Sequence, residues 1–135
     1  QGFRRACREY GLQERLVCLE PNPPAEIEEA RRVAEAKEAT GLVVVGNQHT
    51  CRLIQDLSRL GVSVPADRSI VSIGSLPRSL LSVPALARVH SDPVEMGRVA
   101  ARLLLARTSS VVHRSLPPAY EAGTTVKSLS PSSVP

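Results

Sequence analysis

The sequence predicts an α/β fold in which a parallel sheet is flanked by helices. Helical patterns and short apolar runs alternate along residues 2–74, with short connectors between them. The two clearest runs, LVVVG at 42–46 and SIVSIG at 69–74, are continuous and rich in β-branched residues, which is typical of strands buried on both faces of a parallel sheet. Such alternation arises when right-handed crossovers join successive parallel strands.

The first two helices are marked at their ends. Residues 2–11 carry apolar side chains at helical spacing, and Gly11 is a natural stop. The short apolar run at 15–20 predicts a strand. Residues 24–39 begin with proline and acidic side chains, continue with basic ones and are followed by Gly41. This is the order of charges and caps expected along a helix.

A third helix follows, and after the next strand the regular alternation of helices and strands ends. Residues 48–60 place an apolar stripe on one helical face, which ends at Gly61. After the strand at 69–74 comes a loop rich in Ser, Pro and Leu, and then a short strand within 87–92. The final segments predict two short strands at 111–116 and 119–126.

The helix over 93–106 has the clearest start signal in the chain. Asp92 is a good N-cap, Pro93 suits the first helical position, and Glu95 is placed to complete a capping box. Gly97 is expected to allow close packing against a neighbouring element. We interpret these residues as structural.

Composition narrows the classes of function. The chain has 135 residues, a length suited to one domain, and its net charge of +4 comes from scattered arginines rather than one basic block. Direct contact with nucleic acid phosphates is therefore not expected from this segment. With one phenylalanine, two tyrosines and no tryptophan, an aromatic sugar platform is not expected either.

Cysteine and histidine usage predicts neither a disulfide framework nor a metal site. The three cysteines are odd in number and widely spaced, which indicates a reducing, cytoplasmic compartment. The three histidines are isolated from one another, so no metal and no cofactor are expected. No apolar run is long enough for a membrane span, and no signal peptide is expected.

Blocks of the sequence resemble the closing third of the lactose-repressor (LacI/GalR) family of bacterial transcription regulators. GVSVPADRSIVSIG is similar to the family's G-x-x-V-P-x-D-x-S-V-V-G-F-D, and PALARVHSDPVEMGRVAARLLL is similar to L-T-T-V-x-x-D-x-x-x-M-G-x-x-A-x-x-L-L. QGFRRACREYGL, GLVVVGNQHTCRLIQDLSRLG and LPPAYEAGTTV resemble three further family blocks. The resemblance covers about residues 2–126, with the blocks in the family's order.

This resemblance implies a type I periplasmic-binding-protein-like fold, with two subdomains joined by crossing strands and a small effector in the cleft. The chain would be a C-terminal fragment of it. Residues 1–91 would form part of the C-terminal subdomain, and 92–107 would give the N-terminal subdomain its last helix. Residues 108–126 would return as strands, and 127–135 would be a disordered tail.

The resemblance places effector contacts beyond the carboxyl ends of the strands. Asn47 matches the family's cleft asparagine, whose amide donates and accepts hydrogen bonds; the alternative is that Asn47 caps the following helix. Gln48 stands where the family usually has aspartate, which weakens a contact that would depend on an anionic side chain. His49 and His90 are read as packing or surface residues.

Gly74 also stands where the family commonly has aspartate. Either the effector differs, being anionic or bulkier, or effector sensing is altered; the alternative is that Ser75 or another loop residue substitutes. Arg78 lies on the same loop and could receive a carboxylate or phosphate, or it could simply be solvated.

The family also dimerises through the C-terminal subdomain. By analogy, the apolar faces of 24–39 and 48–60 would contribute, with Leu53 and Leu57 as candidates. Packing in the core is the alternative for both leucines.

The leading hypothesis is therefore the effector-sensing, dimerising part of a cytoplasmic repressor that binds a sugar-like small molecule. DNA would be contacted only through a headpiece outside this chain. The alternative is a solute-binding protein of a transport system, which shares the fold. An enzyme is not expected, because no nucleophile triad, phosphate loop, dinucleotide motif or metal cluster is present.

Overall fold

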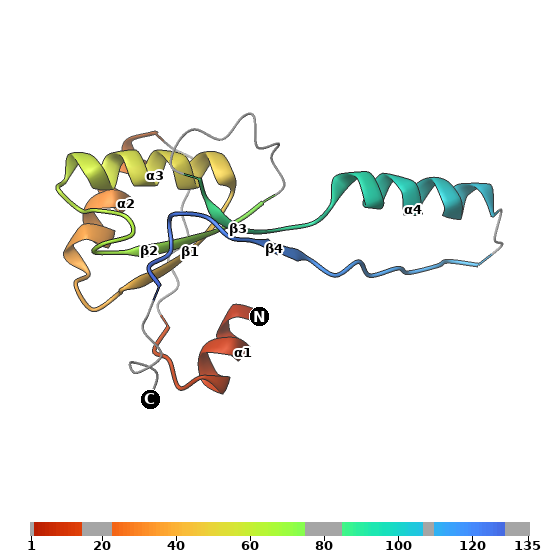
Figure 1. The fold of residues 1–135 in the computed structure, drawn as a ribbon, viewed down its shortest axis with the longest axis horizontal. Coiled ribbons are helices and arrows are strands. Elements are labelled where there is room, and N and C mark those ends of the chain that lie inside the picture. Colours follow the sequence, from red (N-terminus) through yellow and green to blue (C-terminus); the bar gives the residue numbers. More distant parts are fainter. Residues whose placement is uncertain (1, 15–22, 75–84, 107–109, 129–135) are drawn as a thin grey trace.

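The structure is a computed structural model that describes residues 2–14, 23–74, 85–106 and 110–128 (Figure 1). Its strands form one sheet in the order β1-β2-β3-β4. The strands are β1 Gly41–Val45, β2 Ser69–Ile73, β3 Ala87–His90 and β4 Ala119–Glu121. The first three are mutually parallel, and β4 runs antiparallel to β3. The predicted α/β class with a mainly parallel sheet is confirmed.

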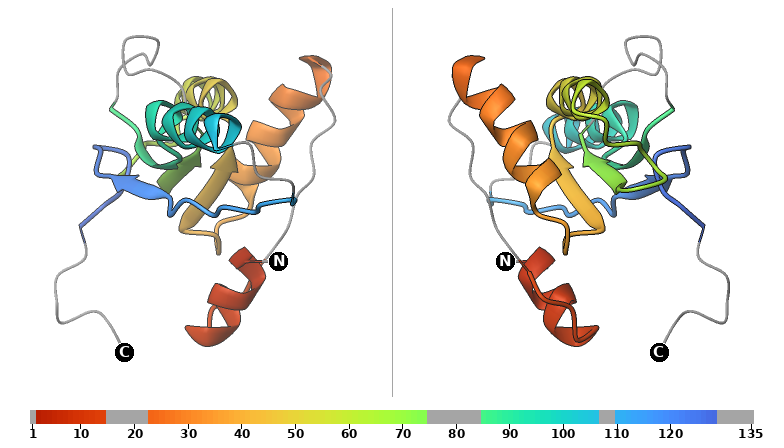
Figure 2. Two further views of the ribbon diagram at one scale, coloured as in Figure 1. Left: turned by 90° about the vertical axis from the view of Figure 1, so that its right-hand side faces the viewer. Right: turned by 90° about the vertical axis from the view of Figure 1, so that its left-hand side faces the viewer.

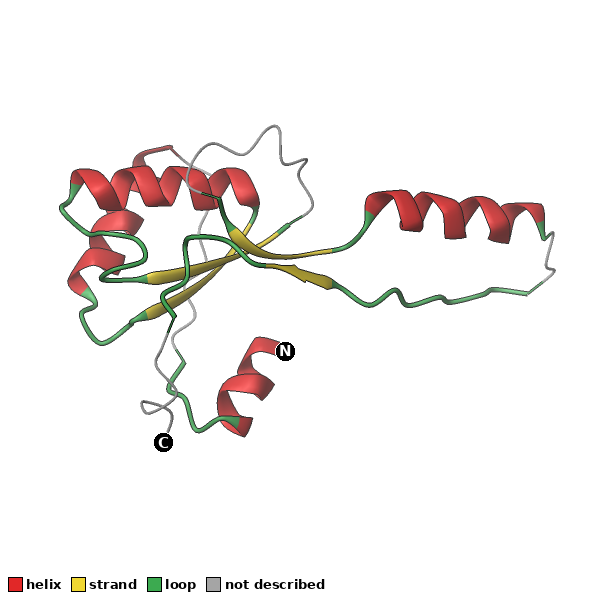
Figure 3. Ribbon diagram, in the orientation of Figure 1, coloured by secondary structure: helices red, strands yellow, loops and turns green. Residues whose placement is uncertain are grey.

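The described helices differ in how they contact this sheet, and one of them projects away from it (Figure 3). They are α1 Gly2–Glu9, α2 Pro23–Glu35, α3 Asn47–Arg59 and α4 Pro93–Leu105. Helix α3 packs on β1 and β2 and also against α2. Figures 1 and 2 both place α1 on the other side of the sheet from α3. Among the described residues, no helix is long and apolar enough to cross a membrane.

The core lies between α3 and the face of the sheet that α3 covers. Ile54, Leu57, Ile70 and Leu86 form its buried centre, with Leu53 packed against it and half-buried. Leu57 has no exposed surface, so its side chain is not available to a partner subunit. The suggestion that Leu57 lies in a dimer interface is therefore wrong, and the alternative of core packing holds for it.

The opposite face of the sheet is largely open, contrary to the expectation that the strands are buried on both faces. Val43, Val45, Ile73 and Tyr120 are each at least 40% exposed on this face. The burial pattern of β1 consequently alternates between exposed and intermediate residues. Both faces of β1 are therefore apolar, but the described helices cover only one of them.

Helix α4 projects away from the sheet (Figure 1) and packs on no other described element. Asp92 caps it as expected, accepting hydrogen bonds from the backbone N–H groups of Val94 and Glu95 at 2.9 and 3.2 Å. The Glu95 carboxylate is held by Arg98 at 2.6 Å. A Cβ added at Gly97 would meet nothing within 4 Å, so the packing expected there has no partner in the described chain.

The last predicted strands are shorter than expected. Residues 110–118 form no strand and run back beside α4 as an extended loop (Figure 3). Of the strand expected at 119–126, only Ala119–Glu121 pairs with β3. The remainder turns at residues 124–125 and is held by Thr125, whose hydroxyl donates to Ile70 O at 2.7 Å and accepts from Ala87 N–H at 2.9 Å. The strand expected at 15–20 lies outside the described residues.

We predict that Gly123→Ala strongly destabilises the fold. A Cβ there would overlap the backbone of Leu86 and Ala87, which cannot withdraw without disturbing β3. The expected loss is on the order of 3 kcal/mol in the free energy of unfolding, measured by urea denaturation. Gly97→Ala is the matched control, because its site is open and alanine favours a helix interior by about 1 kcal/mol. Equal stability of both variants would contradict this account of Gly123.

Candidate functional site

The candidate site lies at the edge of the sheet where β1, β2 and β3 end together. Asn47 and Gln48 follow β1, and Gly74 follows β2. Backbone bonds beyond the strands keep these ends aligned, from Gly46 N to Ile73 O at 2.8 Å and from Gly74 N to Val89 O at 3.0 Å. The predicted residues Ser75 and Arg78 lie outside the described residues.

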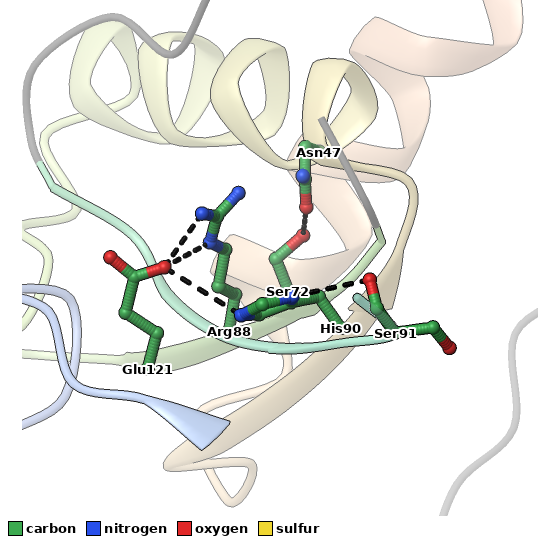
Figure 4. Close-up of polar contacts among 6 residues, drawn as sticks. All are labelled: Asn47, Ser72, Arg88, His90, Ser91 and Glu121. Carbon is green, nitrogen blue, oxygen red and sulfur yellow. Dashed lines mark hydrogen bonds and ion pairs between the residues drawn. The ribbon is translucent and has the colours of Figure 1, made fainter. Parts of the chain in front are cut away.

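Asn47 is the first residue of α3 and is held by the sheet. Gly46 precedes the helix as its N-cap, with φ at 97°, a conformation that favours glycine. Because Gly46 and not Asn47 is the N-cap, the alternative that Asn47 caps α3 is wrong. Instead, Ser72 of β2 donates its hydroxyl to Asn47 Oδ1 at 2.6 Å (Figure 4). Asn47 is only 2% exposed.

Thr50 extends this contact into a short network of buried polar groups. Its Oγ1 lies 2.8 Å from Ser72 Oγ and 2.9 Å from the carbonyl oxygen of Gly46. Thr50 and Ser72 have no exposed surface. Each hydroxyl carries one proton, which Thr50 donates to Gly46 O and Ser72 donates to Asn47. A hydrogen bond between Thr50 and Ser72 therefore forms only when one of the two hydroxyls turns away from its other acceptor.

The nitrogen of the same amide is left without a partner. Asn47 Nδ2 is buried and has no hydrogen-bond acceptor among the described residues. A buried donor in this state costs about 1–3 kcal/mol relative to a satisfied one. Such a cost is offset when a ligand or a water molecule brings an acceptor.

Gly74 leaves room for Asn47. A Cβ added at this position would lie 3.0 Å from Asn47 Oδ1 and 3.3 Å from the backbone nitrogen of Asn47. Any larger side chain at position 74 must therefore displace the amide or bend away from it. The close approach of Asn47 therefore favours glycine at position 74. The comparison of Gly74 with the aspartate of the family pattern did not suggest this.

The neighbouring helix residues face solvent. Gln48 and His49 are both exposed at the start of α3. Gln48 is thus free to reach a ligand at the sheet edge, but it brings an uncharged amide. No acidic residue occupies the first turn of α3.

A second polar group crosses β3 and β4 on the face that carries Ser72. Arg88, the register partner of Ser72, is 7% exposed. Its Nε and Nη2 approach Glu121 Oε2 at 2.7 and 2.6 Å (Figure 4). His90 Nε2 lies 3.8 Å from the same oxygen, so His90 adjoins the ion pair rather than simply packing.

The part of the chain that the structure describes holds no cluster of three or more side chains suited to a metal ion. Its described cysteines, Cys7 and Cys51, are free thiols.

Comparison with known proteins assigns the fold to a family. Residues 1–126 match the family model of the periplasmic binding protein-like domain. The chain belongs to this family. Among curated relatives, the ribose operon repressor of Lactococcus lactis is 28% identical over 104 residues, which cover 73% of this chain and 32% of the repressor.

Solved structures share the periplasmic binding protein-like fold. A LacI family transcriptional regulator from Enterococcus faecium with bound ribose is 21% identical and superposes with a TM-score of 0.78, over 96% of this chain and 50% of that chain. A LacI family regulator from Arthrobacter in complex with lactose is 23% identical, with a TM-score of 0.77 over 92% and 48% of the chains. This chain thus spans about half the length of these structural relatives.

Sequence reasoning missed Ser72, Thr50, Arg88 and Glu121. Ser72 had a visible signal, because it is a polar residue in the otherwise apolar run SIVSIG and stands where the quoted family pattern has glycine. Arg88 likewise stands in a strand where the second quoted family pattern, L-T-T-V-x-x-D, has threonine. Thr50 and Glu121 had no signal, since their partners are 22 and 33 residues away in the chain.

We predict that Ser72→Ala uncouples Asn47 from the sheet. The change removes the donor to Asn47 Oδ1 and one partner of Thr50, with an expected loss of about 1–3 kcal/mol in unfolding free energy by urea denaturation. Ser58→Ala, on the exposed side of α3, is the matched control. A double-mutant cycle with Asn47→Ala should show that the two losses do not add. Full additivity would mean that the bond contributes nothing.

Proposed function

We propose that this chain is the effector-sensing part of a LacI-type transcription regulator and binds a sugar-like molecule at the Asn47 edge of the sheet. The observation that carries the proposal is the family match over residues 1–126 together with a buried amide, that of Asn47, at the carboxyl ends of β1 and β2. In open α/β sheets, ligands bind beyond those ends. The relatives named above are regulators, and two of them hold ribose or lactose.

The cleft would form between this sheet and a second subdomain. Residues 1–91 would belong to one subdomain, the helix in 92–107 to the other, and 108–126 would return to the first. The isolation of α4 supports this division, because Met96, Leu104 and Leu105 are at least 50% exposed and no described element covers them. Apolar side chains of this size are normally covered by a partner surface.

Effector binding would act by shifting the balance between open and closed subdomain arrangements. The shift would reach DNA through a headpiece outside residues 1–135, and the protein would work as a homodimer in the cytoplasm. Leu53, half-buried at the edge of the core, remains a candidate for the dimer contact. Gln48, and Ser75 and Arg78 on the loop after β2, remain candidates for effector contact beside Asn47 and Gly74.

The test is calorimetric titration of the protein expressed from its complete gene with D-ribose, lactose and sucrose. Binding of one of these sugars is expected. Asn47→Ala should raise its Kd about tenfold or more, since one hydrogen bond to an uncharged ligand group contributes about 1.4 kcal/mol to the binding free energy. Gln55→Ala, exposed on the same helix, is the matched control and should leave affinity unchanged.

A gel-shift titration on DNA from upstream of the gene separates the regulator from a transport receptor. The sugar that binds should change the affinity for this DNA, as linkage between two sites requires. Sugar binding without any effect on DNA would favour the transport receptor. Absence of both responses would overturn the proposal.

A further inference from the structure

We propose that the ion pair between Arg88 and Glu121 couples the candidate effector site to the position of α4. Both are positioning residues, since they act through the strands that lead to α4 and back from it. This inference rests on the proposed sensor function and assigns its transmission step to two residues. Three observations support it: the row of polar side chains that contains the pair, the place of the pair near α4, and its burial on a largely apolar face.

The pair lies in a row of polar side chains that crosses the sheet from the candidate site. The hydroxyl of Ser72 lies 2.6 Å from Asn47 Oδ1. Ser72 is the register partner of Arg88, and Arg88 is the register partner of Glu121. Register partners on neighbouring strands point to the same face of a sheet, so these side chains follow one another over β2, β3 and β4 (Figure 4). One end of the row is the candidate site, and the other is the strand that returns from α4.

The pair also lies where the chain leaves the sheet for α4 and comes back from it. The pairing of β3 with β4 is short and ends at His90 and Ala119. Beyond this end the chain enters α4 on one side, and the returning residues 110–118 form no strand on the other. Helix α4 packs on no other described element, so these two segments are its described connections to the sheet. Arg88 and Glu121 join the two segments to each other.

Stability by itself does not account for a charged pair at this place. Two positions earlier on the same face, the chain carries the core residues Ile70 and Leu86. The side chain of Arg88 is only 9% exposed and that of Glu121 is 25% exposed. Removing charges from water is costly, and apolar residues of similar size in place of a buried ion pair are often as stabilising or more so.

The geometry of the pair makes it sensitive to movement of the strands. Arg88 Nε and Nη2 both approach one oxygen, Glu121 Oε2, at 2.7 and 2.6 Å. Such charge-assisted bonds weaken when their distance or angle changes. A movement of α4 that shifts the returning strand therefore changes the energy of the pair beside Ser72. By linkage, a change at Ser72 on effector binding changes the preferred position of that strand.

The first experiment measures a coupling factor, the ratio of the DNA affinities with and without sugar, by gel-shift titration of the protein expressed from its complete gene. The sugar is whichever of D-ribose, lactose and sucrose binds. Glu121→Gln removes the charge with little change of shape and should bring the factor about fivefold or more closer to one. Glu95→Gln is the matched control, because Glu95 pairs with Arg98 at the same 2.6 Å but within α4. It should leave the factor unchanged.

The second experiment separates coupling from stability. Glu121→Gln leaves the buried guanidinium of Arg88 without this carboxylate and should lower the urea midpoint of unfolding. Adding Arg88→Gln removes the buried charge, so the double variant should regain part of that midpoint. Its coupling factor should stay as close to one as that of Glu121→Gln, because the ion pair is still absent. If Glu121→Gln does not fold, the double variant takes its place in the first experiment.

A coupling factor in Glu121→Gln equal to that of the unchanged protein would overturn the coupling role and leave the sensor function standing. Recovery of the factor together with the urea midpoint in the double variant would also overturn it, because the pair would then serve stability alone. If none of the three sugars changes the DNA affinity of the unchanged protein, the regulator function fails, and the coupling role fails with it.

Discussion

The hydrogen bond from Ser72 to Asn47 is the contact on which the arrangement of the site depends. It joins the middle strand of the parallel set to the first residue of α3, and Thr50 reinforces it from the next turn of the helix. In a buried setting, such a chain of bonds is stronger than its members in water. It fixes the start of α3 against the sheet and holds the Asn47 side chain close to Gly74, where an added Cβ would lie 3.0 Å from Asn47 Oδ1.

Two apolar surfaces are left uncovered by the described residues. One face of the sheet packs on α3, while Val45 and Tyr120 on the other face are 74% and 61% exposed. Helix α4 has no buried residue and packs on no described element. These exposed surfaces agree with a chain that spans about half the length of its structural relatives. The polar site lies on the covered side, at the edge from which the chain leaves toward α4.

The ion pair of Arg88 with Glu121 gives β3 and β4 a polar link where the chain leaves and returns. Arg88 is largely buried, so the cost of desolvating its charge offsets much of what the pair contributes to net stability. Together with Thr125, which bridges β2 and β3, it holds the returning segment although only three residues of it pair as a strand. The segments that lead into α4 and back from it are thus held to the sheet, although α4 itself packs on no described element.

The sequence by itself determined the alternation of helices and strands over the described part of residues 23–74 and the cap of α4, because these depend on neighbours within a few residues: glycine stops, β-branched runs and the Asp92–Pro93 start. It also placed Asn47 and Gly74 at one edge of the sheet, since parallel strands end together. It could not determine that Asn47 bonds to Ser72 rather than capping α3, that Leu57 is core, or that 110–118 forms no strand. Those outcomes depend on contacts between residues distant in the chain, and only the tertiary structure brings such residues together.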